Sequence, residues 1–267
     1  MIELVRVTGL ATVQDDGRPG LMHAGVPPGG AMAPERLAFA NAAAGNAAGA
    51  TALESFGDLE LVARRAIHLA TDAGVTRTIA AGEHARFERP RNRRVHYVAV
   101  RGGIDVPIAL GGRGTLLTAA LGGHEGRALR RGDVLRIGDG MADPRATSAA
   151  PRNDDGPIAL VLGPDLDAFT PEAVALLTAG AFTISPSSDR TGTRLQGPRL
   201  ALRGGPPRAS APMVRGAIEV PPDGAPIVLG PDHPTTGGYP VIACVAAADF
   251  GRFMSIPLGA PVRFVVR

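Results

Sequence analysis

The sequence predicts a mainly β fold with a few short helices, built as two barrel-like units. Short apolar runs separated by glycine, proline and aspartate recur along the 267 residues, at intervals typical of barrels and sandwiches. Only two segments have the start and stop residues of a good helix. A short pattern, Gly-x-x-x-Arg followed by an apolar residue, occurs three times and suggests related β units in tandem.

The expected strands are short and spread over the whole chain. They are residues 2–7, 59–63, 95–101, 134–137, 158–162, 217–220, 227–229 and 262–266. The repeated pattern lies at 82–87, 132–137 and 259–264, and each copy predicts a turn that leads into a strand. The single cysteine, Cys244, stands in an apolar run and is expected to be a buried strand residue without an intrachain disulfide.

The first expected helix, residues 34–44, has proline in its first turn and glycine just after its end. The second, residues 170–179, follows a threonine N-cap with proline and glutamate, and glycine comes next. A third, residues 246–254, is weaker because Gly251 interrupts it. The stretch 138–157 is rich in Asp, Pro, Ala and Gly and is the best linker, so we expect units at 1–150 and 157–267.

All 28 basic residues are arginine, and lysine is absent. The chain therefore has no Schiff-base lysine, phosphate-loop lysine or biotinyl-lysine, and a partner must supply any such group. A net charge of +3, two tyrosines and no tryptophan give no support to nucleic-acid binding. No signal-peptide pattern and no apolar run of 18 residues occurs, so we expect a cytoplasmic protein without a membrane partner.

The six histidines are spread singly, without the spacing of a metal site, and we expect no metal. A Gly-x-Ser-x-Gly nucleophile elbow is also missing. General acid–base chemistry would fall to one of a few side chains, which the sequence does not rank: Asp15, Asp189, Asp232, His233 and Tyr239.

Two segments near the C-terminus, 188–197 and 235–240, combine glycines with hydroxyl and arginine side chains. Glycine lets backbone N–H groups approach a ligand, and arginine offers a planar fork for carboxylate or phosphate. They predict a binding surface for a small anionic or amide-like ligand; the alternative is two hairpin turns with a surface Asp–Arg pair. The expected catalytic residues are Asp189 and Tyr239, and the expected substrate-binding residues here are Arg190, Arg194, Thr235, Thr236, Gly237 and Gly238.

The N-terminal loops 14–20 and 25–32 precede the first helix, whose N-terminus favours anions. Arg18, Gly29 and Gly30 join the expected substrate-binding set, and the alternative is a structural entry loop. We expect Arg18 to converge with the C-terminal segments on one cleft. The glycine-rich segments 111–115 and 122–127 are interpreted as ordinary loops.

In order and spacing these motifs resemble, over nearly the whole chain, a family variously called the C subunit of 5-oxoprolinase, allophanate hydrolase subunit 2 and biotin-dependent carboxyltransferase. Besides the C-terminal segments, the motifs are Gln14-Asp15 with Gly17-Arg18, Gly25-Val26-Pro27 with Gly29-Gly30-Ala31-Met32, Ala40-Asn41 with Gly45-Asn46, Leu53-Glu54, Arg101-Gly102-Gly103-Ile104, and Gly122-Gly123 with Gly126-Arg127 and Gly132-Asp133. The resemblance implies tandem cyclophilin-like β-barrels in a hetero-oligomeric hydrolase that uses ATP to open 5-oxo-L-proline to L-glutamate. The implied partners are the cyclophilin-like B subunit and the separate A subunit of that enzyme.

The resemblance leaves two alternatives open. One is the carboxyltransferase component of a biotin-dependent urea or amide carboxylase, with biotin carried elsewhere. The other is a non-catalytic regulatory partner of a cyclophilin-like subunit. The second is favoured by departures from the family's polar residues, which imply altered substrate choice or a reduced catalytic role: Ala33, Ala211, Pro212, Glu219, Pro234 and the segment 111–115.

Overall fold

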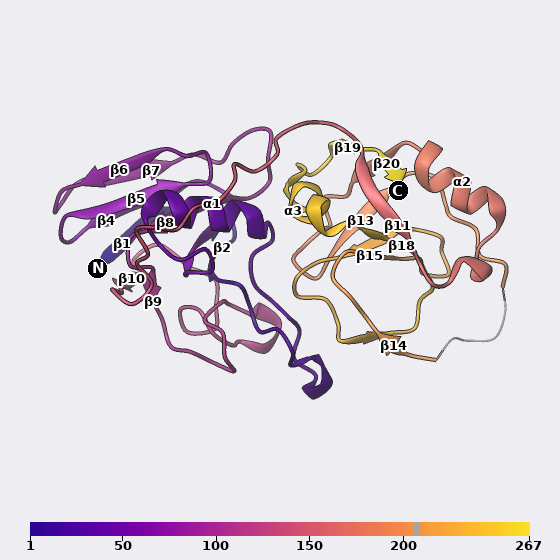
Figure 1. Cartoon of the computed structure of the whole chain (residues 1–267), viewed down its shortest axis with the longest axis horizontal. Coiled ribbons are helices and arrows are strands. Elements are labelled where there is room, and N and C mark those ends of the chain that lie inside the picture. Colours follow the sequence, from indigo (N-terminus) through magenta and orange to yellow (C-terminus); the bar gives the residue numbers. More distant parts are fainter. Residues whose placement is uncertain (205–208) are drawn as a thin grey trace. The chain divides into compact units, whose positions relative to one another are not determined.

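The structure is a computed structural model that describes residues 1–204 and 209–267. Its chain divides into two compact units, one of residues 1–19 and 29–151, the other of residues 20–28 and 152–267. The fold is mainly β with three α-helices, as the sequence predicted (Figure 1).

The first unit consists of two five-stranded antiparallel sheets, with strand orders β7-β4-β1-β10-β9 and β2-β3-β8-β5-β6. Apolar side chains from both sheets form one core, which includes Leu4, Leu61, Leu135, Val13 and Val98. Helix α1 lies against β5 and β8. The bounds are β1 Ile2–Val7, β2 Ala11–Gln14, α1 Pro34–Ala44, β3 Ala52–Ser55, β4 Leu59–Ala63, β5 Ile67–Thr71, β6 Thr76–Ile79, β7 His84–Phe87, β8 His96–Val100, β9 Ile104–Asp105 and β10 Val134–Ile137.

The second unit is built on an eight-stranded sheet in the order β19-β12-β13-β16-β15-β18-β11-β20. Its edge strands β19 and β20 are separated in the chain only by Arg263, so one segment pairs with β12 on one side and β11 on the other and nearly closes a barrel. The short pair β14-β17 is separate. The bounds are β11 Ile158–Leu162, α2 Pro171–Ala179, β12 Phe182–Ile184, β13 Gly192–Gln196, β14 Ala211–Pro212, β15 Ala217–Glu219, β16 Ile227–Leu229, β17 Thr236–Gly237, β18 Val241–Val245, α3 Ala247–Ser255, β19 Pro261–Val262 and β20 Phe264–Val266.

The helix boundaries follow their capping residues. Gly45 adopts a left-handed conformation (φ 75°) directly after α1, and the Thr170 side chain accepts a hydrogen bond from Ala173 N at the start of α2. The weaker third helix is continuous through Gly251, because α3 buries Phe250, Phe253 and Met254. Burial of three large apolar side chains outweighs the roughly 1 kcal/mol that a glycine costs in a helix.

Several predicted strands are confirmed with their bounds, namely 2–7, 59–63, 134–137, 158–162 and 227–229. The predicted strand 262–266 is interrupted at Arg263, where pairing changes from one edge of the barrel to the other. The segment 192–196, which was not among the predicted strands, is strand β13: Thr193 and Leu195 are buried while Arg194 and Gln196 are exposed. Cys244 lies in a strand, but its predicted burial is wrong, since its side chain is half-exposed on β18.

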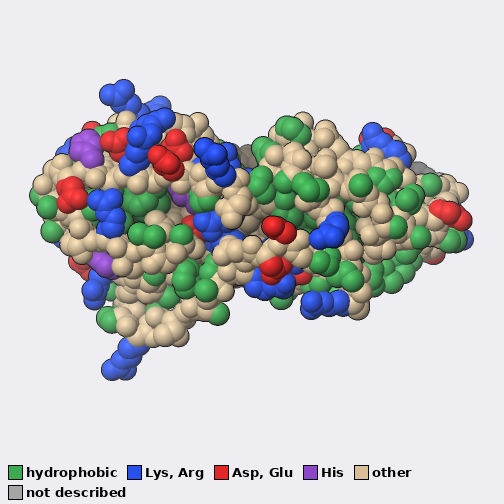
Figure 2. All heavy atoms as spheres, turned by 90° about the horizontal axis from the view of Figure 1, so that it is seen from above, with side chains coloured by type: hydrophobic (Ala, Val, Ile, Leu, Met, Phe, Trp, Pro, Cys, Tyr) green, Lys and Arg blue, Asp and Glu red, His purple; other side chains and the backbone are tan. Residues whose placement is uncertain are grey.

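Arginine side chains are spread over the face in Figure 2, among acidic side chains, and form no single basic surface there. None of the helices in the described part of the chain is both long and apolar enough to cross a membrane.

Candidate functional site

The two C-terminal segments singled out from the sequence both lie in the second unit. The Asp189 carboxylate accepts hydrogen bonds from Thr191 N (2.8 Å) and Gly192 N (3.1 Å), which forms a tight turn before β13. Next to it, Gly230 N donates to Thr191 O at 2.9 Å. A Cβ atom at Gly230 would lie 2.1 Å from Arg190 O, so only glycine permits this approach.

A buried ion pair joins the first segment to Asp232, three residues before the second segment begins. Arg190 Nε donates to Asp232 Oδ2 at 2.8 Å and Arg190 Nη2 to Asp232 Oδ1 at 2.9 Å, and both side chains are almost fully buried. Asp232 N also donates to Arg190 O at 3.1 Å. The anion that faces the Arg190 fork is therefore the carboxylate of Asp232, and this pair fixes the position of the residues that follow it.

The residues after Asp232 lead into β17, which pairs with β14. Met213 N donates to Thr235 O at 3.0 Å, and the Met213 side chain lies against Gly237. Within the described part of the chain, the hydroxyls of Thr235, Thr236 and Tyr239 have no hydrogen-bond partner, and Tyr239 is 47% exposed. This segment thus presents three hydroxyl groups that can bind a ligand.

The carboxyl group of Glu219 lies on the strand next to the end of the segment 235–239. Arg194, Ile227 and Glu219 are aligned across β13, β16 and β15, on the outer face of the barrel, because their neighbours Thr193, Val228 and Ile218 are buried. Burial raises the pKa of the half-buried Glu219 carboxyl, and the nearby Arg194 charge opposes that shift. Val220 N donates to Pro240 O at 3.0 Å, which places β15 beside the end of the Thr235–Pro240 stretch. The sequence showed Glu219 only as a departure from a family pattern.

His233, between the ion pair and the hydroxyls, is fully buried, and that burial lowers the pKa of its imidazole. Its Nδ1 lies 2.7 Å from Pro234 O, so Nδ1 carries the proton and donates. Among the described residues nothing hydrogen-bonds to Nε2. A neutral ring in this state positions the backbone before Thr235.

In the first unit, Arg18 is 1% exposed, and its guanidinium donates to three backbone carbonyls: Ala109 O at 2.8 Å, Gly114 O at 2.8 Å and Gly112 O at 3.5 Å. Asp15 accepts from Gly17 N at 2.8 Å and from Arg113 N at 2.6 Å. These bonds hold the loop 109–114 against the turn that carries Arg18.

Gly29 and Gly30 have left-handed conformations (φ 64° and 84°), and a Cβ on Gly30 would lie 2.9 Å from the carbonyl carbon of Asp16. They place the chain so that Met32 N donates to Glu54 Oε2 at 2.8 Å and Ala33 N to Tyr97 Oη at 2.9 Å. These distant side chains hold the backbone just before α1.

The structure therefore gathers Asp189, Arg190, Arg194 and the segment 235–239 in the second unit, and Arg18, Gly29 and Gly30 in the first. No group of three or more His, Cys, Asp or Glu side chains in residues 1–204 and 209–267 could hold a metal ion. What the assembled groups offer is hydrogen-bond donors, one arginine fork and a carboxyl with a raised pKa.

The chain is similar to known proteins over nearly its whole length. Residues 24–266 match the family model described as "Carboxyltransferase domain, subdomain A and B". The chain is 34% identical to the C subunit of 5-oxoprolinase from Escherichia coli, over 99% of this chain and 91% of that protein. It is 30% identical to urea amidolyase of Lachancea kluyveri, over 95% of this chain and 16% of that protein. Its structure is similar to part of the Kluyveromyces lactis urea amidolyase, with a TM-score of 0.84 and 26% identity, covering 99% of this chain and 18% of that one.

Proposed function

The chain belongs to the carboxyltransferase domain family, subdomains A and B, and from this we propose that it is a subunit of an ATP-dependent 5-oxoprolinase that opens 5-oxo-L-proline to L-glutamate. One observation carries the proposal: the match to the C subunit of 5-oxoprolinase extends over nearly the whole of both chains. The similarity to urea amidolyase covers only a small part of a much longer protein.

The chain's own contribution is a substrate-binding surface. 5-Oxoproline has a carbonyl next to a nitrogen and a separate carboxylate. The hydroxyls of Thr235 and Thr236, which have no hydrogen-bond partner among the described residues, suit the carbonyl, because donors aimed at a carbonyl oxygen stabilise the charge that develops when it is attacked. Arg194 suits the carboxylate. The backbones of Gly237 and Gly238 let a ligand approach closely.

Two residues have proposed roles in proton transfer. Asp189 uses Oδ1 for its own turn and is exposed, which leaves Oδ2 for a ligand. Tyr239 has an exposed phenol. Arg190, Arg18, Gly29 and Gly30 complete the proposed substrate-binding set by fixing the loops, since both guanidiniums are buried.

ATP would be handled by partners. The chain has no lysine with which to bind phosphate groups in the usual way. We propose a cyclophilin-like B subunit and a separate A subunit as those partners, so that activity belongs to the hetero-oligomer.

A second candidate is the carboxyltransferase component of a biotin-dependent urea or amide carboxylase, supported by the similarity to urea amidolyase. Urea also presents a carbonyl next to nitrogen, so the same surface suits it. Carboxyl transfer from carboxybiotin to urea, without glutamate release from oxoproline, would favour this candidate. Failure of both reactions in the assembled complex would favour the non-catalytic regulatory partner.

The site is tested by Thr236→Ala in the reconstituted complex. Loss of a hydroxyl donor to the substrate carbonyl should lower ATP-dependent glutamate release by at least about tenfold. The matched control is Thr178→Ala, because the Thr178 hydroxyl is exposed on α2 and bonds only its own helix. Equal activity in both variants would remove Thr236 from the site.

A further inference from the structure

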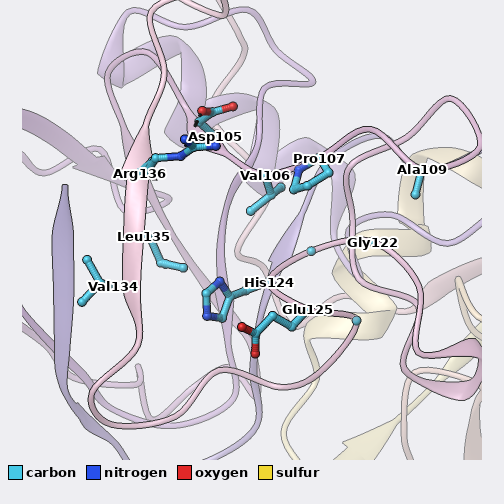
Figure 3. Close-up of a pocket in the computed structure, with 12 residues that line it drawn as sticks. Asp105, Val106, Pro107, Ala109, Gly122, His124, Glu125, Val134, Leu135 and Arg136 are labelled. Carbon is cyan, nitrogen blue, oxygen red and sulfur yellow. Dashed lines mark ion pairs between the residues drawn. The ribbon is translucent and has the colours of Figure 1, made fainter.

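A pocket of about 390 Å³ opens in the first unit between β9, β10 and the turn 122–126 (Figure 3). Figure 3 shows Arg136 beside Asp105 at one end and His124 with Glu125 at the other. Val106 and Pro107 lie along one side, with Leu135 across from them. None of the lining residues belongs to the substrate-binding set proposed above.

Residues outside the pocket hold its lining loops in place. Arg18 holds the carbonyl of Ala109, which lines the pocket, and a Cβ on the lining residue Gly122 would lie 2.3 Å from Arg18 Nη2. At Gly123 a Cβ would lie 1.9 Å from Thr115 Oγ1. These glycines let the turn 122–126 lie directly on the loop 112–115, so the pocket is preformed.

The charges at the Asp105 end favour an anion. A single carboxylate faces two guanidiniums there, with Asp105 Oδ1 3.5 Å from Arg113 Nη1 and Asp105 Oδ2 3.5 Å from Arg136 Nε. This leaves one positive charge in excess.

The guanidiniums of Arg113 and Arg136 differ in their hydrogen bonds. Arg113 also donates to Val106 O. The guanidinium of Arg136 forms no hydrogen bond with any residue that the structure describes, and the side chain is 71% exposed. Its N–H fork is available for a ligand, and a carboxylate fits it in two-point contact.

The other end carries no excess negative charge. The Glu125 carboxylate is paired with Arg127 at 2.9 Å, and Asp133 behind it accepts two hydrogen bonds from Arg127 at 2.8 Å each and lies 3.8 Å from Arg130 Nε, so two guanidiniums balance the two carboxylates. Between the two ends the surface is mostly apolar, formed by Val106, Pro107 and Leu135. Such a surface suits a short hydrocarbon body.

We infer that this pocket binds a small organic acid, with its carboxylate on Arg136 and a compact apolar body against Val106, Pro107 and Leu135. The inference goes beyond the proposed function and does not depend on it, since the pocket's chemistry selects any acid of this shape.

The test is an NMR titration of the full chain with acetate, propanoate, butanoate and pentanoate, with pentylamine as the cationic counterpart. Pentanoate should shift the amide signals of residues 105–109 and 122–126 and should bind at least tenfold more tightly than pentylamine. Affinity should rise roughly fourfold with each added methylene until the pocket is filled.

Arg136→Gln should weaken pentanoate binding at least tenfold. Arg77→Gln, the same change at an exposed arginine of β6 outside the pocket, should leave it unchanged. Equal binding of pentanoate and pentylamine, signal shifts outside the pocket, or wild-type affinity in Arg136→Gln would overturn the inference. If Arg136→Gln fails to fold, two measurements on the wild-type chain still decide whether the pocket binds the acid. These are the positions of the shifted amide signals and the affinity of pentanoate relative to pentylamine.

Discussion

Arg190 and Asp232 connect two segments that lie 42 residues apart in the chain, and both side chains are buried. At the residue scale this pair determines where Thr235 and Thr236 lie. A buried charge that loses its partner is strongly destabilising, so Arg190→Met should lower the free energy of unfolding by about 3–5 kcal/mol. The matched control is Arg199→Met, which breaks an exposed pair with Asp223 at 3.5 Å and should change stability by about 1 kcal/mol or less. Urea unfolding of both variants measures the difference; equal values would mean that the buried pair does not organise the loops.

Glu219 predicts a dependence of stability on pH. Its folded-state pKa is raised by burial, so the folded state holds the proton more tightly than the unfolded chain. Its stabilising contribution is therefore fully present below the unfolded pKa and is lost as the pH rises through the folded pKa. Glu219→Gln removes this loss, so the variant should gain stability over the wild type as the pH rises through the carboxyl range.

Urea unfolding between pH 3 and 8 checks this, with Glu88→Gln, a change at an exposed carboxyl of the first unit, as the control. A difference between Glu219→Gln and wild type that stays flat over that range would mean that the carboxyl is not desolvated.

Some of the site was predictable from residue types. Glycine next to arginine and threonine marked the segments 188–197 and 235–240, and the structure bonds the first to Gly230 and Asp232, which closely precede the second. The partners were not predictable, because Arg18 binds carbonyls 91 to 96 residues away and Arg190 binds a carboxylate 42 residues away. Sequence spacing carries no information about contacts that the tertiary fold creates.

At the scale of elements, glycine has two different roles. Gly82, Gly132 and Gly259 precede strands with φ between 80° and 91°, and a Cβ on any of them would meet nothing within 4 Å. They are needed for conformation alone. Gly123 has φ 55° and is also packed against Thr115 Oγ1, which is buried.

This difference gives a prediction. Gly82→Ala should lower the free energy of unfolding by about 1–2 kcal/mol, the strain of a left-handed alanine. Gly123→Ala adds a steric clash in a tightly packed place and should lower it by about 1–3 kcal/mol more. Thermal and urea unfolding would measure both, and equal losses would show that the turn 122–126 moves to accommodate the added methyl group.

Strands with strong apolar runs and helices with capping residues could be predicted, often to the residue, as for β1, β4, β10 and α1. Strand β13 could not, because its inward-facing residues include Thr193 rather than a second large apolar side chain. The continuity of α3 also depends on tertiary burial, which local propensity does not contain. The interpretation of 122–127 as an ordinary loop missed that this turn lines a pocket.

At the scale of the whole molecule, the chain has two compact β units and no lysine. In the proposed function, the hydroxyls, arginines and backbone amides described above bind and orient the substrate. Under the same proposal, energy from ATP enters through other subunits. The account predicts that this chain alone is inactive and that it completes the activity of its partners.

The most direct test measures ATP-dependent release of L-glutamate from 5-oxo-L-proline by three preparations: this chain alone, the candidate A and B subunits together, and all three combined. The account predicts turnover only in the combined preparation, with a stable complex on size-exclusion chromatography. Robust turnover by the single chain, or full turnover by the other two subunits without it, would contradict the account.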